Sequence, residues 1–417
     1  MRFVSCLTWI GIMLNSAVCH TQDAESRDSN TASATAIARY DSDSVTGSSR
    51  AVVVDRAELV HTTQLLPTDD SGELVSGNLQ DQIDCVFSRL RTVMQNVHAA
   101  PDRLVKLNCY VADDASRPVI IRTITKHWRG QELPAVAWVQ TSLPLSKAQV
   151  AVDAVIAVVP TLTETQPAFG RLSEQPPQTA DWCVMPTGDA VYVSGQAEKG
   201  DLPVATTETL KSLLRTLEHM YLERRHIVGL KCFLQPMAEA DVVNRQIAEF
   251  FGSDIVPPVS HVEWISSGSP IEIELVAAAP RTSSSDSVTY SAPPWMKTSP
   301  VYSRVARIHG DRRIYVAGLY AAENGDGAAQ VRSVFDSLEQ ILKSAGSDFR
   351  HLAKATYYVS DDDSSSQLNA LRPSLYDPQR PPAASKAMVS GVADDRRTIT
   401  LDMIAAPAAV PSHPAKK

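Results

Sequence analysis

The sequence repeats one pattern three times, and this repetition constrains the fold more than any other feature. In each copy an amphipathic helix leads to a lysine at the start of an apolar strand. These lysines are Lys106, Lys231 and Lys354. They are separated by 125 and 123 residues, so the copies have nearly equal length. Self-similarity at a fixed period indicates one structural unit used repeatedly.

The same elements flank each lysine. A helix with apolar side chains at intervals of three and four residues is predicted to begin 24 residues before it. The first residues of these helices are Gln82, Thr207 and Gln330. A proline-led strand and an alternating strand with an acidic residue follow. The order strand–strand–helix–strand–helix–strand–strand predicts an α+β unit with its helices on one face of a sheet.

The copies divide the chain into segments. They cover about residues 51–158, 180–279 and 300–407. Between them, 160–180 and 280–300 are rich in Pro, Gly and Ser, which is the composition of linkers.

The ends of the chain have other compositions. Residues 1–19 have a positive start, a short apolar run and a small-residue end, which is typical of a secretory signal peptide. We expect export to the periplasm or the exterior, with a lipid anchor on Cys19 as the alternative. No run is long enough to span a bilayer, so no membrane span is predicted. Residues 20–50 and the tail 408–417 predict flexible segments.

Charge and motifs exclude several function classes. The net charge is −8, which disfavours nucleic-acid binding and nuclease activity. No nucleotide-binding loop and no metal-ligand spacing occur, so neither a cofactor nor a metal is predicted. Four cysteines remain after the signal segment, and their irregular spacing predicts mostly buried thiols. They are Cys85, Cys109, Cys183 and Cys232.

Several segments of the middle copy follow one another in a fixed order. They are Val191-Tyr192-Val193-Ser194-Gly195-Gln196, Asn244 with Phe250-Phe251, Pro257-Pro258 and Ile271-Glu272-Ile273-Glu274. This set resembles the RidA (YjgF, endoribonuclease L-PSP) family of reactive imine and enamine deaminases. The third copy resembles the family's opening strands around Tyr302 and Gly318. The middle copy is closest to the family, and the first copy, with Thr62-Thr63-Gln64, is the most divergent.

The resemblance implies a chorismate-mutase-like α+β unit. Family members are homotrimers with a central barrel, outer helices and a ligand cleft at each subunit interface. We therefore expect this chain to be a monomeric pseudo-trimer with small-molecule clefts between its copies. The alternative is a string of domains that trimerise between chains.

The family's signature site holds the substrate carboxylate with an arginine in a Pro-Ala-Arg-Ser strand. The matching positions here are Val136, Val259 and Ala384, so all copies lack it. Two residues further on, on the same face of the strand, stand Trp138, His261 and Lys386. The sequence predicts that Trp138 fills the vacated space. His261 and Lys386 are candidate ligand-binding residues.

The last strand of each copy keeps an acid, which in the family holds the attacking water. By this resemblance the candidate catalytic residues are Asp153, Glu274 and Asp402. Further positions match the family's pocket and are candidate substrate-binding residues. They are Ser194, Gly195, Asn244, Tyr302 and Gly318. We expect the recurring lysines to hold the junctions between helix and strand.

Two functions stay open. Loss of the arginine favours a binding protein without turnover, whereas retention of the acid favours a deaminase or related hydrolase with an altered substrate. The second hypothesis uses Glu274 and water, with His261 or Lys386 as electrophilic partner. Ribonuclease activity ranks below both because of the acidic charge.

Overall fold

The computed structural model describes residues 35–43, 46–75, 77–128, 131–163, 165–173, 179–265, 268–392 and 396–408. The predicted signal peptide, the first part of the predicted tether and all but the first residue of the predicted tail lie outside these ranges.

The predicted order of elements occurs three times along the chain. The first repeat contains β2 (Ser48–Asp55), β3 (Glu58–Thr62), α1 (Leu79–Asn96), β4 (Leu104–Val111), α2 (Arg117–His127), β5 (Leu133–Gln140) and β6 (Val150–Val158). The second contains β8 (Trp182–Met185), β9 (Asp189–Gln196), α3 (Leu202–His219), β10 (Ile227–Leu234), α4 (Ala240–Phe251), β11 (Val259–Glu263) and β12 (Ile271–Ala279). The third contains β14 (Val305–Ile308), β15 (Arg313–Val316), α5 (Gly327–Ser344), β16 (Leu352–Val359), α6 (Asp362–Leu375), β17 (Ala383–Met388) and β18 (Ile399–Ala405).

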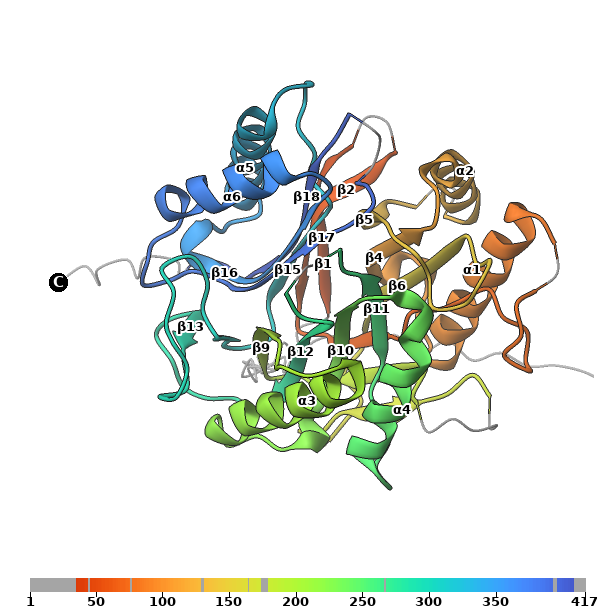
Figure 1. Ribbon diagram of the computed structural model, residues 1–417, viewed down its shortest axis with the longest axis horizontal. Helices are drawn as coiled ribbons and strands as arrows, with labels where there is room; N and C mark the ends of the chain where they lie inside the picture. Colours follow the sequence, from red (N-terminus) through yellow and green to blue (C-terminus); the bar gives the residue numbers. More distant parts are fainter. Residues whose placement is uncertain are drawn as a thin grey trace, which may run out of the picture. The chain divides into compact units, whose positions relative to one another are not determined.

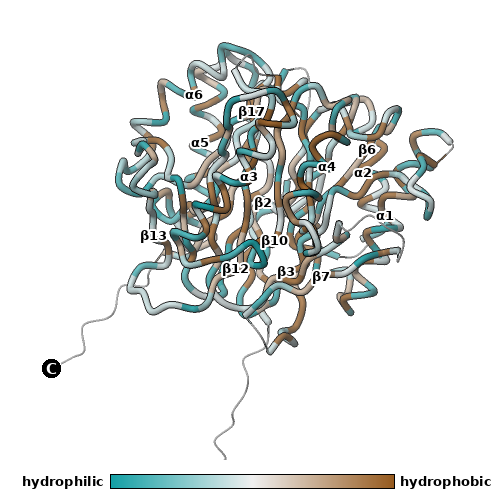
Figure 2. Tube along the Cα trace, turned by 60° about the horizontal axis from the view of Figure 1, so that its bottom comes forward, coloured by the Kyte–Doolittle hydropathy of each residue, from teal (hydrophilic) through white to brown (hydrophobic). Residues whose placement is uncertain are grey.

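Each repeat builds the same mixed sheet. Its lysine-bearing strand pairs in parallel with the proline-led strand and antiparallel with the acid-bearing strand, as β10 does with β11 and β12. The two helices of each repeat pack against its own strands (Figure 1). Hydrophobic residues are concentrated along strands such as β2 and β10, whereas the helices alternate in character (Figure 2). The predicted α+β unit is confirmed.

Strand pairs also join the repeats to one another. The first strand of one repeat pairs antiparallel with the second strand of another, in β3–β8, β9–β14 and β15–β2. A core of small and apolar side chains is shared by all three repeats; Val52, Tyr192 and Ile404 are examples. The predicted central barrel is not confirmed, because the described strands form a twelve-stranded and a six-stranded sheet and no closed barrel. The sheets are separate because β8 and β9 are not hydrogen-bonded to each other, nor are β14 and β15.

The main helices begin earlier than the sequence predicts. The structure starts them at Leu79, Leu202 and Gly327, three to five residues before the predicted positions. The residue before each start caps the helix, because its side chain accepts a backbone N–H of the first turn. The capping residues are Asn78, Asp201 and Asp326.

The predicted tether is wrong for its second half. Residues Ala36–Ser42 form β1, which pairs antiparallel along β2. The Arg39 guanidinium donates to the carbonyl oxygens of Asp102 at 2.6 Å and Leu104 at 3.1 Å, which anchors β1 to the first repeat. The polar composition of this segment did not indicate a strand, because an edge strand needs few apolar side chains when its backbone is paired.

The linkers also contain short strands. The first carries β7 (Ala168–Gly170), which pairs with β8, and the second carries β13 (Val288–Ser291), which pairs with β14. The cysteines of the described chain are free thiols, of which Cys109, Cys183 and Cys232 are buried and Cys85 is half-buried. This confirms the thiol prediction. Within the described ranges, no helix has the length and apolar character needed to cross a membrane.

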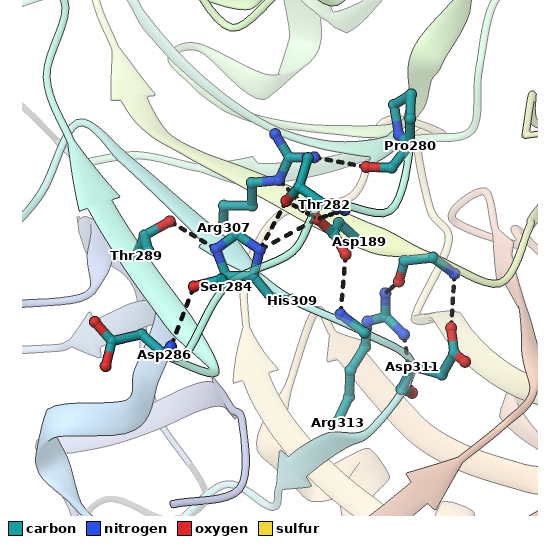
Figure 3. A network of polar contacts seen from close by, with 12 residues as sticks. Asp189, Pro280, Thr282, Ser284, Asp286, Thr289, Arg307, His309, Asp311 and Arg313 are labelled. Atoms are coloured by element: carbon teal, nitrogen blue, oxygen red, sulfur yellow. Dashed lines mark hydrogen bonds and ion pairs between the residues drawn. The ribbon is translucent and has the colours of Figure 1, made fainter. Parts of the chain in front are cut away.

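A polar network fixes the second linker to the start of β9 (Figure 3). The buried Asp189 carboxylate accepts from the Thr282 hydroxyl at 2.7 Å, Arg307 Nε at 2.9 Å and the Gly310 backbone N–H at 2.9 Å. His309 Nδ1 lies 3.2 Å away. Burial would raise the pKa of Asp189, but these donors outweigh it and lower the pKa.

We predict that Asp189→Asn lowers the free energy of unfolding by about 2 kcal/mol or more, because an amide cannot satisfy Arg307 and the buried donors. A group with a lowered folded-state pKa stabilises above its unfolded pKa and loses this effect as pH falls. The difference in the free energy of unfolding between wild type and Asp189→Asn, measured by urea denaturation, should therefore be present at pH 7 and shrink below about pH 4. Asp70→Asn, on an exposed turn, is the matched control. Equal stabilities of the two variants at pH 7 would contradict the prediction.

Candidate functional site

The recurring acids and lysines meet in one buried cavity. In the second repeat the lysine stands directly opposite the acid, as the cross-strand pair Lys231 and Glu274. In the other two repeats Asn108 and Thr356 stand opposite the acids. The cavity has a volume of about 90 Å³ and is lined by residues from all three repeats. Its charged residues are Lys106, Lys231, Lys354, Asp153, Glu274 and Asp402. The structure therefore brings the three candidate catalytic acids together in one cavity.

Asp402 connects two lysines from other repeats. Its carboxylate oxygens lie 3.2 Å from Lys106 Nζ and 3.6 Å from Lys231 Nζ. Burial would raise the pKa of Asp402, but the three ammonium groups outweigh burial and hold the pKa well below its usual range. Burial lowers the pKa of Lys106 despite the attraction of Asp402. Lys106 also donates to the Val316 carbonyl at 2.6 Å, which ties the first repeat to the third.

The other two acids are equally engaged. Glu274 forms an ion pair with Lys354 at 2.9 Å. Asp153 accepts from Asn108 Nδ2 at 2.7 Å, the Tyr110 hydroxyl at 2.5 Å and the Ser260 hydroxyl at 2.8 Å. Two of these contacts, Glu274 with Lys354 and Asp153 with Ser260, cross from one repeat to the next. The recurring lysines thus join repeats across the interior, beyond the helix-to-strand junctions at which we expected them to act.

The boundary between the second and third repeats holds a further acid, Glu272, which was not predicted as a site residue. Glu272 packs against Gly195, where an added Cβ would lie 2.0 Å from its Oε1. Burial raises the pKa of Glu272 to about 7, although Ser385 and Arg304 oppose the shift. Ser385 Oγ also accepts the Gly195 backbone N–H at 3.1 Å. Gly195 is therefore required for the carboxylate to approach the strand.

Alternation along β12 could not separate the two glutamates. Both stand opposite the apolar side of the strand, whose Ile271 and Ile273 lie in the helix-covered core. The register between β12 and β9 shifts between Ile273 and Leu275. Gly195 was the available signal, because a glycine beside a charged strand position indicates close approach.

The boundary between the first and second repeats is filled. Gln64 Nε2 donates to the His261 carbonyl at 3.0 Å, and its Oε1 accepts the His261 N–H at 3.2 Å. The His261 side chain is buried, and burial lowers its pKa to about 4. The imidazole is therefore neutral at pH 7. It is not presented to an open cleft.

The boundary between the third and first repeats is open. A cleft of about 380 Å³ lies where the Gly318 N–H bonds the Val136 carbonyl at 2.9 Å. Trp138 lines this cleft beside Val136. It forms part of the wall and does not fill the space, contrary to the prediction. The Arg117 guanidinium lies 5.6 Å from the centre of the Trp138 ring. The Tyr320 ring, 6.0 Å from the same guanidinium, completes an aromatic wall.

The remaining predicted residues are dispersed. Lys386 donates to Ser365 Oγ at 2.9 Å and to Asn369 Oδ1 at 3.3 Å, so α6 holds it. The centre of the Tyr302 ring lies 4.9 Å from Arg304 Cζ, and Tyr302 lines a separate cavity of about 240 Å³. Asn244 is exposed on α4. The Ser194 hydroxyl is buried and has no hydrogen-bond partner among the described residues.

No cluster of three or more His, Cys, Asp and Glu side chains within the described ranges is arranged to hold a metal ion. The described residues provide an aromatic and cationic cleft at one boundary, and at another boundary a carboxyl, Glu272, whose pKa burial raises to about 7.

Comparison with known proteins agrees with this architecture. Residues 42–159 and 295–406, more than half of the 417, match the family model Endoribonuclease L-PSP. The match does not extend over 180–279, the copy whose motifs stand closest to the family in the sequence analysis. No curated protein matches the chain.

Solved structures match about one repeat each. A YjgF-family protein from Neisseria meningitidis is 17% identical, with 30% of this chain and 97% of that chain covered and a TM-score of 0.23. A Rid-family protein of unknown function from Yersinia pestis is 23% identical, with 29% of this chain and 98% of that chain covered and a TM-score of 0.27. A member of the YjgF/YER057c/UK114 family from Mycobacterium tuberculosis is 23% identical, with 25% of this chain and 86% of that chain covered and a TM-score of 0.21.

We predict that Asp402→Asn lowers the free energy of unfolding by about 3–5 kcal/mol, because two buried ammonium groups lose their shared counter-charge. Glu208→Gln breaks an exposed pair with Lys211 and should cost less than about 1 kcal/mol. Because the folded-state pKa of Asp402 is lowered, its contribution is present at neutral pH and declines as pH falls below about 4. Chemical denaturation at pH 7 and pH 3 measures both effects. A pH-independent difference between wild type and Asp402→Asn would refute this account.

Proposed function

Because the chain belongs to the Endoribonuclease L-PSP family, we propose that it is a single-chain pseudo-trimer that binds a small molecule in the open cleft between its third and first repeats. The cyclic order of the pairings β3–β8, β9–β14 and β15–β2 supports the pseudo-trimer. Covalent linkage makes association of the units intramolecular. The proposal includes export, which rests on the signal-peptide pattern of residues 1–19.

One observation carries the binding proposal: the three boundaries have diverged, and one is hollow. Gln64 closes on β11 at the first boundary, and Glu272 packs on Gly195 at the second. The third retains a cleft of about 380 Å³ with an aromatic wall, which is the size and lining of a small-molecule site. At the second boundary the neighbour of Gly195 is the Glu272 carboxylate. At the third boundary a neighbour of Gly318 is the Thr400 hydroxyl. A hydroxyl at its ordinary pKa is a poor general base, so this cleft is suited to binding.

We predict that the cleft binds a planar fragment of benzene-ring size, tested with benzamide and benzoate. Ala322 is exposed at the cleft lining, so Ala322→Trp should obstruct it and weaken binding at least tenfold. Ala238→Trp, at an exposed position that does not line the cleft, should leave binding unchanged. Isothermal titration calorimetry gives the affinities. Absence of binding by wild type, or equal affinity in Ala322→Trp, would sink the proposal.

A second candidate function is imine hydrolysis at Glu272. A carboxyl with a pKa of about 7 exchanges a proton readily at neutral pH, which suits a general base for water attack. The imine carbon would gain the water oxygen and release ammonia, giving the keto acid. Glu274, considered for this role from the sequence, is ion-paired to Lys354 in the interior. Ribonuclease activity remains disfavoured by the net charge of −8.

We predict that any hydrolysis of 2-iminopropanoate, followed by ammonia release, rises with pH through about 7 as Glu272 loses its proton. Glu272→Gln should reduce the rate at least a hundredfold. Glu274→Gln serves as the comparison, and its folding is checked by circular dichroism. A wild-type protein with no turnover, or a Glu272→Gln variant that keeps its rate, would eliminate this candidate.

A further inference from the structure

The interior cavity that the recurring lysines and acids line also contains polar atoms without a partner. Tyr315 and His61 line this cavity, and the Tyr315 hydroxyl and His61 Nε2 have no hydrogen-bond partner within the described residues. Tyr315 is only 1% exposed. Leaving such a buried group unsatisfied is unfavourable, and most buried polar groups in native structures do have a partner. The cavity is therefore a candidate binding site, and it shares no lining residue with the open cleft.

The three lysines supply further donors to this cavity. An ammonium group has three N–H donors, and each of these lysines has two polar partners within the described residues. Lys231, for example, contacts the Tyr358 hydroxyl at 3.4 Å and Asp402 at 3.6 Å. Lys354 contacts the Thr356 hydroxyl at 2.5 Å and Glu274 at 2.9 Å. One donor of each lysine is left for a ligand.

The charge around the cavity favours an anion. The three lysines and three acids of the lining balance one another. Arg313 adds a cation that is 0% exposed, and its terminal nitrogens donate to the backbone carbonyls of Asp311 and Gly188, each at 3.0 Å. It forms no ion pair with any residue of the described ranges. Its charge reaches the cavity wall, because burial and Arg313 together lower the pKa of His61 to about 3.

The cavity is large enough for a small ion and has a route to solvent. Its volume of about 90 Å³ exceeds the about 10–15 Å³ that one water molecule needs. Two of its lining residues, Gly229 and Val276, are half-buried, so the wall is reached by solvent at these positions. Asn108 Oδ1 is an acceptor without a partner, and a water molecule beside the ion would satisfy it.

We propose that the interior cavity binds a small monovalent inorganic anion, of the class of chloride, which accepts hydrogen bonds from the Tyr315 hydroxyl and the lysine ammonium groups. Water could satisfy the same donors, but only an anion also balances the buried charge of Arg313, and an unbalanced buried charge is costly. This site is independent of the proposed function of the open cleft.

The test uses chloride as the probe and gluconate as an anion too large for the cavity. At pH 7 and equal ionic strength, urea denaturation of the full chain should give a higher free energy of unfolding in sodium chloride than in sodium gluconate. The increase should follow the logarithmic dependence on chloride concentration that binding to the folded state produces. Crystals grown with sodium bromide should show an anomalous scattering peak beside the Tyr315 hydroxyl.

Tyr315→Phe tests the role of the hydroxyl. Because the hydroxyl has no protein partner, this variant should keep its stability in gluconate, while its apparent affinity for chloride falls about tenfold. Tyr221→Phe makes the same change at a side chain that is 96% exposed, and it should behave as wild type.

Equal stabilities of wild type in chloride and gluconate would overturn the proposal, as would a bromide-grown crystal whose cavity gives no anomalous signal and so contains water only. A chloride effect of equal size in Tyr315→Phe would place the binding elsewhere on the protein and would also overturn it.

Discussion

The structure depends on hydrogen-bonded pairing between the first strand of one repeat and the second strand of another. A strand at the edge of a sheet leaves a row of N–H and C=O groups unpaired, and these must find partners. Here β3 pairs with β8, β9 with β14 and β15 with β2. Each repeat thus completes its neighbour's sheet, and the apolar faces away from the helices pack into one shared core.

The interior charges follow from the same pairing. Because the strands converge, a lysine and an acid from each repeat reach a common cavity. Asp402 is shared by lysines of two other repeats, and Asp153 accepts the hydroxyl of Ser260 from the second. Buried ion pairs give little net stability against apolar replacements, but an unpaired member is costly. The cluster therefore disfavours any arrangement in which one repeat is shifted relative to the others.

Local sequence patterns predicted the repeat and its elements well, because apolar periodicity and strand alternation are properties of short segments. The helix starts were misplaced because the caps Asn78, Asp201 and Asp326 lie before the apolar stripe begins. The site was harder to predict. Alternation could not distinguish Glu272, which contacts Gly195, from Glu274, which is ion-paired with Lys354. The open cleft could not be predicted either, because it depends on the pairing of β2 with β5, a strand more than 80 residues away.

Linkage of three units in one chain removes the requirement that the three boundaries be identical. In a homotrimer, one substitution alters every interface together, because symmetric subunits share one sequence. In this chain Gln64 closes one boundary, Glu272 and Ser385 occupy the second, and the third has a cleft of about 380 Å³. The closed boundary contributes buried contacts, so the other two can carry groups whose burial is unfavourable. The Glu272 carboxyl, whose pKa burial raises to about 7, is such a group. Its place away from the boundary that Gln64 closes is consistent with a division between holding the assembly together and binding a ligand.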